Sequence, residues 1–561
     1  MLALCGLPVF FLEVSFGQFA SLGPLSIWRV NPLFKGVGVA MVLVTVYVNL
    51  YYNILVAHIL YYFFASMARE VPWTHCGPRG KTLSPVWAPT LNKTLLNSYI
   101  EDNNITRADL KTPSEEYFYR NVLQISEGID EPGTIVWRLA LCLLLVWIII
   151  FLVLIKGISS LGKVVYFTST FPYLMMTVMI VRGATLDGAM KGVMFYLRPQ
   201  WSRLLSSEVW SDAAAQIFYS LSTCSGGLIA MASYNNFKNN SYRDSILIPV
   251  VNCVTSVFAG FSIFTVLGYL AQQKDLEVKD VAASGPGLVF VVYPEGLATM
   301  PLAPVWSVLF FFMMLTLGFS SSFSLAEVVF VAILDEFPRK LRATPYTPII
   351  FRGVVCILYF LFSLPMLTNG GFYLFNILDT YAGGFPRLFT GIFELIAIIW
   401  VYGFARFAED VEMMTGHKPN LYFRACWTVI APLIITGIVI FKGIQHQPLE
   451  MFKKLYPAWG DVLGWVMVGS IICWIPVGFF VQWCRGGGLA ALRQTASPKA
   501  KWGPAFERNR TGRYRTGGVI ALTTLSTTTL DIDVTVPNNG DVDKDNLRAT
   551  EDGAYVNNAY L

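Results

Sequence analysis

Charged residues, histidines and paired cysteines are scarce in this chain of 561 residues. Only 14% of the residues are charged, and the nine cysteines include no C-x-x-C pair. The four histidines are isolated from one another at His58, His75, His417 and His446. These absences exclude a zinc site of the usual spacing, a disulfide framework and a recognisable catalytic constellation. We therefore expect no enzyme activity.

Apolar residues are abundant: 55% of the chain is hydrophobic, 15% is aromatic, and the mean hydropathy is +0.54. This composition demands several membrane spans. Runs of about 20 apolar residues predict eleven helices, near 1–27, 36–66, 136–157, 163–183, 211–234, 243–271, 304–334, 347–367, 371–404, 421–442 and 461–484. The sequence predicts an all-α polytopic membrane protein with a transmembrane body over 1–484 and a flexible cytoplasmic tail over 485–561.

The polar loop over 68–134 carries two glycosylation sequons, at Asn92 and Asn104, which indicates an extracellular face. Basic residues fall on the opposite side of the predicted spans, as expected for cytoplasmic loops. They include Arg29, Lys35, Lys156, Lys163, Lys238, Arg243, Arg339, Lys340 and Arg342. Eleven spans and a cytoplasmic tail would place Met1 outside the cell, so we expect a further helix before it. Insertion with the N-terminus outward is the alternative.

One predicted span, within 209–236, is interrupted by small and polar residues over Ser222–Gly227. Non-helical backbone at membrane depth survives only where protein or a water-filled cavity satisfies its N–H and C=O groups. The interruption therefore indicates a broken helix with a binding site at its centre. A continuous helix that uses small residues for close packing is the alternative.

Ten motifs in the chain resemble the neurotransmitter:sodium symporters, which are sodium- and chloride-dependent neurotransmitter and amino-acid transporters. They are GLPVFFLEVSFGQF…SIWR (6–29), LYYN (50–53), QIFYSLS…GG…ASYNNF (216–237), YRDS (242–245), VNCVTS (251–256), SGPGLVFVVYPE (284–295), TLGFSSSF (316–323), LDEFP (334–338), LDTYAG (378–383) and KWGPAF (501–506). The resemblance implies an inverted-repeat fold of the bacterial leucine-transporter type. About eleven of the family's twelve helices are present, and the family's first helix is missing.

Sodium requires several oxygen ligands, which carbonyls at a helix break and neutral hydroxyls or amides supply. The resemblance places Ser220 and Asn252 at a first sodium site. It places the Leu317 carbonyl, Ser320 and Ser321 at a second. Taken alone, the serine run over 320–322 would indicate a packing face of small residues.

Gln216 and Ser220 lie four residues apart, as do Asn252 and Ser256, so each pair occupies one face of its own helix. Neutral N–H and O–H donors suit chloride, and the resemblance implies that these four residues bind it. Hydrogen bonding that merely joins the two helices is the alternative.

The resemblance also implies a substrate pocket. Its residues are Val48, Tyr52, Tyr219, Ser220, Ser222 and Ser225, with the Tyr52 hydroxyl on the substrate carboxylate and Tyr219 as a lid. Ser225 stands where many relatives carry a large aromatic residue, which indicates a roomier pocket.

Carboxylates inside a membrane are costly and usually functional. The resemblance implies that Glu13 braces the broken helix and that Asp379 belongs to an outer gate. It places Asp335 at an inner gate together with Tyr234. The arginine partners of both aspartates belong to the family's first helix region. A solvated loop charge is the alternative for Asp335. Cys76 corresponds to the first cysteine of a pair in the family's outer loop, and the second cysteine of that pair is missing here.

The predicted function is symport of a small neutral amino acid or related neurotransmitter at the plasma membrane, driven by sodium with chloride and proceeding by alternating access. Sodium and chloride are co-transported ions, and no other cofactor is expected. The lipid bilayer is a partner, nucleic acid is not, and homo-oligomerisation is left open. The alternative is a truncated, non-transporting membrane partner of a full-length relative. Without the first helix, we expect the chain alone to accumulate no amino acid.

Overall fold

The computed structural model describes residues 1–74, 112–281, 285–444, 447–452, 454–485 and 495–515. Ten stretches of this part of the chain are long and apolar enough to cross a membrane. Their elements are η1 Leu2–Gly6 with α1 Leu7–Ala20; η3 Pro32–Phe34 with α2 Lys35–Ala65; α5 Trp137–Leu154; α6 Ile158–Ala184; α10 Ser241–Lys274; α13 Ala303–Glu336; α15 Thr347–Ser363 with η8 Leu364–Leu367; α16 Gly371–Ala382, α17 Phe385–Leu395, η9 Ile396–Gly403 and α18 Phe404–Thr415; α19 Leu421–Ala425, η10 Cys426–Ile430 and α20 Ala431–Ile444; and α21 Ala458–Ile472 with α22 Trp474–Arg485.

The one predicted span outside these ten stretches, near 211–234, is the broken segment. It forms α8, Ser207–Ser220, and α9, Gly227–Ala232. The all-α polytopic prediction is therefore confirmed. Shorter elements connect the spans: η2 Ser26–Val30, α4 Pro113–Glu116, η5 Tyr117–Val122, α7 Ala189–Leu197, η6 Trp201–Leu205, α11 Val278–Val281, η7 Leu288–Val292, α12 Tyr293–Ala298, α14 Pro338–Leu341, η12 Glu507–Asn509 and η13 Gly512–Tyr514. Two short strands, β1 Glu450–Met451 and β2 Lys454–Leu455, pair antiparallel.

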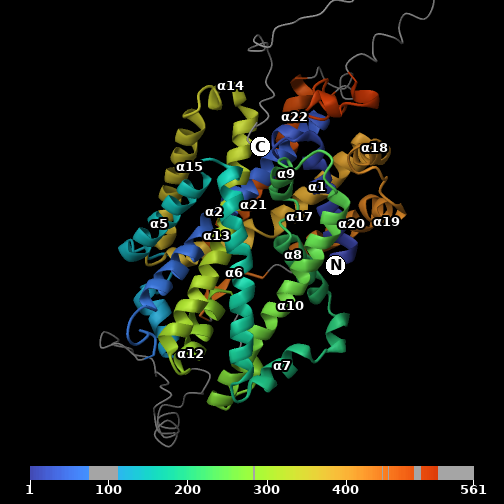
Figure 1. The fold of residues 1–561 in the computed structure, drawn as a ribbon. Helices are drawn as coiled ribbons and strands as arrows, with labels where there is room; N and C mark the ends of the chain where they lie inside the picture. Colours follow the sequence, from blue (N-terminus) through green and yellow to red (C-terminus); the bar gives the residue numbers. More distant parts are fainter. Residues whose placement is uncertain (75–111, 282–284, 445–446, 453, 486–494, 516–561) are drawn as a thin grey trace, which may run out of the picture.

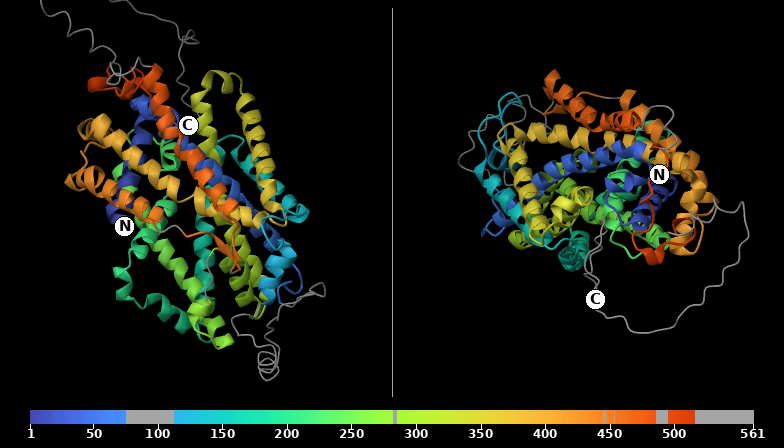
Figure 2. Two further views of the ribbon diagram at one scale, coloured as in Figure 1. Left: turned by 180° about the vertical axis from the view of Figure 1, so that it is seen from behind. Right: turned by 90° about the horizontal axis from the view of Figure 1, so that it is seen from above.

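Helix α2 runs through the middle of the bundle and packs against α13, α5 and α22 (Figures 1 and 2). Glycines allow α2 to cross α22 closely. A Cβ built on Gly478 of α22 would lie only 2.6 Å from the Cα of Gly36 on α2, so a larger residue would not fit there. Helix packing in membranes relies on such close approach, since lipid supplies no hydrophobic drive between helices. Polar α2 residues are consequently held inside the protein, where they can form a site.

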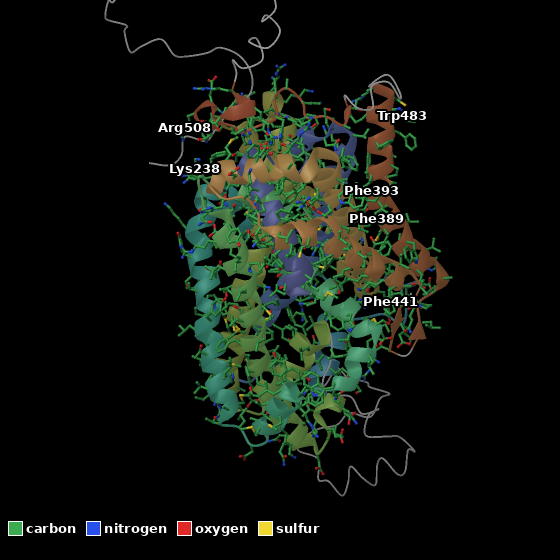
Figure 3. All side chains as sticks on the ribbon, turned by 90° about the vertical axis from the view of Figure 1, so that its right-hand side faces the viewer. Lys238, Phe389, Phe393, Phe441, Trp483 and Arg508 are labelled. Atoms are coloured by element: carbon green, nitrogen blue, oxygen red, sulfur yellow. The ribbon has the colours of Figure 1, made fainter. Side chains whose placement is uncertain are left out.

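The residues predicted to be cytoplasmic gather at one end of the bundle. Helix α14, which carries Arg339 and Lys340, lies at the same end as α18 and α22, and α7 and α12 lie at the other (Figure 1). Lys238 and Arg508 also lie at the α14 end (Figure 3). This arrangement agrees with the orientation predicted from the basic residues. The sequons at Asn92 and Asn104, and Cys76, lie outside the described residues.

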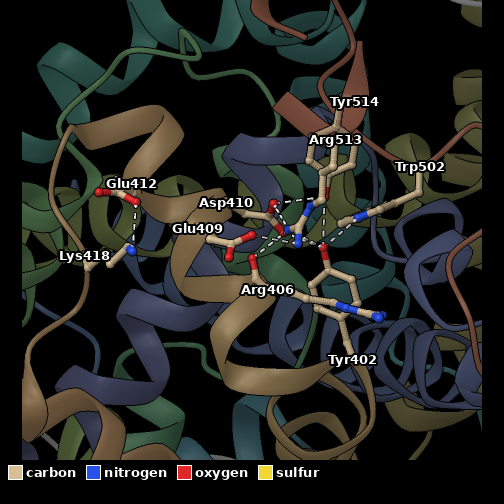
Figure 4. A network of polar contacts seen from close by, with 9 residues as sticks. All are labelled: Tyr402, Arg406, Glu409, Asp410, Glu412, Lys418, Trp502, Arg513 and Tyr514. Atoms are coloured by element: carbon tan, nitrogen blue, oxygen red, sulfur yellow. Dashed lines mark hydrogen bonds and ion pairs between the residues drawn. The ribbon is translucent and has the colours of Figure 1, made fainter. Parts of the chain in front are cut away.

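Part of the predicted flexible tail is docked on the body, so that prediction is wrong for residues 502–514. Trp502 is buried against the rings of Phe16 and Phe19. Arg513 donates to the Asp410 carboxylate at 2.5 Å, and the Tyr514 hydroxyl donates to it at 2.9 Å (Figure 4). Burial raises the pKa of Tyr514 to about 12, so the phenol stays protonated near neutral pH and can donate. Sequence polarity alone did not indicate these partners.

Candidate functional site

The predicted break in the membrane helix is present between α8 and α9. Residues 221–226 form turns, and Ser222, Cys224 and Gly226 have φ angles of 55°, 59° and 75°. Left-handed backbone is uncommon for residues other than glycine, and it costs about 1–2 kcal/mol per residue. The break at Ser222–Gly227 is confirmed, and the surrounding structure must hold it in place.

Three helices supply that support through buried side chains. The Glu13 carboxylate of α1 accepts a hydrogen bond from the Cys224 N–H at 2.5 Å. The Thr390 hydroxyl of α17 donates to the Cys224 carbonyl at 2.9 Å, and the Thr45 hydroxyl of α2 donates to the Ser225 carbonyl at 2.8 Å. Backbone groups exposed by the break are thereby satisfied without water. Glu13 makes the bracing contact that the resemblance implied, and its part in transport stays a prediction.

Further ionisable groups surround the break. A carboxylate oxygen of Glu13, one of Glu394 and the Cys224 sulfur all lie within 4.8 Å of one another. Glu394 is buried, and neither of its oxygens has a hydrogen-bond partner among the described residues. Arg387, two turns earlier on α17, is also buried, with its guanidinium carbon 5.1 Å from the centre of the Tyr219 ring. The break is therefore surrounded by buried ionisable groups.

The residues predicted to bind the first sodium and the chloride are partly brought together. The Asn252 amide of α10 donates to the Ser220 hydroxyl at 2.7 Å, which joins the two helices at the end of α8. Ser256 donates to the Asn252 carbonyl of its own helix at 3.0 Å. Gln216 and Ser256 are both exposed. The Ser220–Asn252 contact suits either ion binding or the joining of helices, so both interpretations stay predictions.

The second predicted sodium site lies beside a predicted substrate residue. Tyr52 of α2 interacts with the Ser321 side chain of α13 and lies near Tyr219. Ser320 is half-buried, and Leu317 and Ser321 are exposed. Hydroxyl groups from two helices thus meet on the side of the bundle that holds the break.

The other predicted substrate residues lie in the break or on the helices beside it and differ in exposure. Val48 is buried one turn before Tyr52, and the Tyr219 hydroxyl lies 3.4 Å from that of Tyr51. Ser222 is exposed, whereas Ser225 is buried and donates to the Ser222 carbonyl at 2.8 Å. Ser225 therefore stabilises the turn in addition to shaping any pocket.

The two residues predicted for an inner gate, Tyr234 and Asp335, have separate partners, and their role in gating stays a prediction. Tyr234 donates to Glu327 at 3.1 Å rather than to Asp335, and Glu327 lies 3.6 Å from Arg352. Asp335 binds Arg342 at 2.5 Å and accepts from the Gly23 N–H at 2.9 Å. The pairing of the Asp335 carboxylate does not fit the solvated-charge alternative.

Asp379, the residue predicted for an outer gate, is exposed and lies near the Tyr51 side chain, and its role stays a prediction.

Sequence reasoning missed Glu327, Arg387 and Glu394, which are buried and lie at these sites. A signal was available, because all three are ionisable residues inside predicted spans, where charge is expensive. Thr45 and Thr390 carried no such signal. Only the tertiary contacts reveal that they support the break.

A family model described as "Sodium:neurotransmitter symporter family" matches residues 1–486. The chain is 45% identical over 527 residues to sodium- and chloride-dependent glycine transporter 1 of Xenopus laevis, covering 92% of this chain and 83% of the relative. It is 44% identical over 542 residues to the human sodium- and chloride-dependent neutral and basic amino acid transporter B(0+), covering 92% and 84%. It is 40% identical over 542 residues to glycine transporter 2 of Xenopus laevis, covering 92% and 68%.

A family match over most of the chain, similarity to these transporters, and a membrane helix broken at the residues that carry the resemblance all agree. The expected absence of enzyme activity fits this membership, because the members are transporters. The protein belongs to the sodium:neurotransmitter symporter family.

Proposed function

We propose that the protein couples the sodium gradient, with chloride, to the uptake of a small neutral amino acid at the plasma membrane, with glycine as the first substrate to test. The broken helix is the main support for the proposal. Ser220, at the end of α8, accepts a hydrogen bond from Asn252, and Tyr219, the predicted lid, lies near Tyr52. The names of the relatives, two glycine transporters and a neutral and basic amino acid transporter, support this class of substrate.

Alternating access follows from the arrangement. Sodium and substrate would bind near the break, with the predicted oxygen ligands of α8, α10 and α13, and would shift the equilibrium between outward and inward forms by their differential affinity. The comparisons give no support to a non-transporting partner, so we propose neither that role nor the expected failure of the chain alone to accumulate amino acid. Homo-oligomerisation stays open.

Uptake of radiolabelled glycine, leucine and lysine by cells expressing the full chain tests the function. Each amino acid is measured in sodium chloride, in N-methylglucamine chloride and in sodium gluconate, with surface labelling to verify delivery. Asn252→Ala should lose uptake, whereas Val254→Ala, a change two residues away at an exposed position of the same helix, should retain it. Absence of sodium-dependent uptake from a chain that reaches the surface would refute the proposal.

A further inference from the structure

Arg387 is a cation buried in the membrane with most of its hydrogen-bonding capacity unused. The residue is 3% exposed, and no carboxylate of the described residues lies within ion-pair distance of it. Its Nη1 group donates to the carbonyls of Phe218 and Tyr219 at 3.4 and 3.5 Å, and its Nε has no partner. A guanidinium offers five N–H donors, and leaving such a group unpaired in a low dielectric is costly.

A purely structural role accounts for only part of this arrangement. The two carbonyls belong to the last turn of α8, so Arg387 partly caps the helix at the break. Both bonds lie at the long limit for a hydrogen bond and are weak. Glu13 does not pair with it: one Glu13 oxygen accepts from the Cys224 N–H, and the other has no partner among the described residues and lies beyond ion-pair distance of Arg387. A neutral donor such as glutamine would cap α8 equally well and at a lower desolvation cost.

The unused edge of the guanidinium has the geometry that a carboxylate requires. The Nε–H and one Nη2–H of an arginine point in parallel, and Nη2 makes no hydrogen bond with any described residue. Such a fork binds the two oxygens of a carboxylate in a bidentate manner. The bonds already formed use only the opposite nitrogen, Nη1.

The position of Arg387 strengthens the attraction for an anion. It is the third residue of α17, which has 11 residues and begins after Gly384, a residue with no side chain to cap the helix. A cation is unfavourable at the positive end of a helix dipole unless an anion is bound there. The Tyr219 ring covers the guanidinium, and Tyr219 is itself 39% exposed, so rotation of the ring would uncover it.

We propose that Arg387 and the first turn of α17 form a carboxylate-binding site beside the break, under the Tyr219 ring and in addition to the Tyr52 hydroxyl that the resemblance assigns to the substrate carboxylate, which makes Arg387 a specificity-determining residue for carboxylate-bearing substrates. The proposal deepens the proposed function and rests on it for the identity of the substrate. Chloride is the other monovalent anion that this edge could bind, and it has separate candidate ligands at Gln216, Ser220, Asn252 and Ser256.

A binding assay tests the site without requiring transport. The full chain is purified into lipid nanodiscs, and its thermal stability is measured in sodium methanesulfonate with added sodium acetate, sodium chloride, glycine or glycinamide. Arg387→Gln removes the charge, Arg387→Lys retains the charge without the fork, and Arg424→Gln, an exposed arginine on α19, is the matched control. Stabilisation of the folded state reports ligand binding by mass action.

We expect acetate and glycine, but not glycinamide, to stabilise the wild type. In Arg387→Gln, their half-saturating concentrations should rise by about tenfold or more, while the response to chloride is kept. Arg387→Lys should show the same loss for acetate, which decides the matter if Arg387→Gln does not fold. Equal acetate and glycine responses in wild type and both variants would overturn the proposal. A loss confined to chloride would overturn it too, because the site would then bind a halide.

Uptake by the same variants separates this proposal from the proposed function. If the wild type takes up no amino acid, the proposed function fails, and the acetate response still decides whether Arg387 binds a carboxylate. If the wild type transports glycine and Arg387→Gln shows an unchanged KM, only the present inference fails.

Discussion

The closest approach of α17 to the broken helix provides a direct test of how the break is held. A Cβ added at Gly391 would lie 2.6 Å from the Cys224 sulfur and 3.3 Å from its Cβ. The first distance is too short for any real contact, so Gly391→Ala must push α17 away from the break or turn the cysteine. Overpacking of this kind costs about 1–3 kcal/mol. It would also weaken the bond from Thr390, one residue earlier, to the Cys224 carbonyl.

A second substitution should relieve the clash. Cys224 has a φ of 59°, which glycine adopts freely, so Cys224→Gly removes the sulfur and about 1–2 kcal/mol of backbone strain. Its backbone bonds to Glu13 and Thr390 are kept. The greater entropy of a glycine in the unfolded chain offsets about 0.5–1 kcal/mol of this gain. The single variant should therefore be near wild type, and the double variant should recover most of the stability lost by Gly391→Ala.

Apparent melting temperature in nanodiscs and glycine uptake are the measurements. Gly437→Ala on α20 is the control, because an added Cβ there meets no atom within 4 Å. The expected order of stability places Cys224→Gly and Gly437→Ala near wild type, the double variant slightly below, and Gly391→Ala lowest. A Gly391→Ala protein as stable and active as wild type would refute the packing argument. A double variant no better than Gly391→Ala would refute the assignment of the clash to the sulfur.

Three further changes test the predicted ion sites and the docked tail. Ser256→Glu places a fixed negative charge at the predicted chloride site, so uptake in sodium gluconate should approach that in sodium chloride, and an unchanged chloride requirement would contradict the site. Ser321→Ala removes one predicted sodium ligand and should raise the sodium concentration for half-maximal uptake; superimposable activation curves would indicate that the serine only packs. Asp410→Asn removes the buried carboxylate from Arg513, which is 32% exposed and keeps its pair with Glu409, so the loss should be about 1–3 kcal/mol and should speed proteolysis of the tail. Protection equal to wild type would show that Tyr514 and Trp502 suffice.

Sequence and structure agree most closely where local chemistry decides the outcome. The length and hydropathy of the apolar runs determine the spans, because every backbone polar group in lipid must be bonded within a helix. The run over Ser222–Gly227 determines the break, since small and polar residues there favour turns over a continuous helix. The motif residues were sufficient to indicate the family. None of these inferences requires knowledge of which helices are neighbours.

Partner choice is decided by tertiary structure. Tyr234 donates a hydrogen bond to Glu327, and Arg342 forms an ion pair with Asp335, because the packing of α9, α13 and α14 determines which groups come within reach. Only the approach of α17 places Arg387 at the end of α8 and Thr390 on Cys224. The tail is polar in sequence, yet Trp502 and Arg513 find aromatic rings and a buried carboxylate on the body. Periodicity and composition report what each residue prefers. The energy of a buried charge depends on its neighbours, and those are fixed only when distant helices pack together.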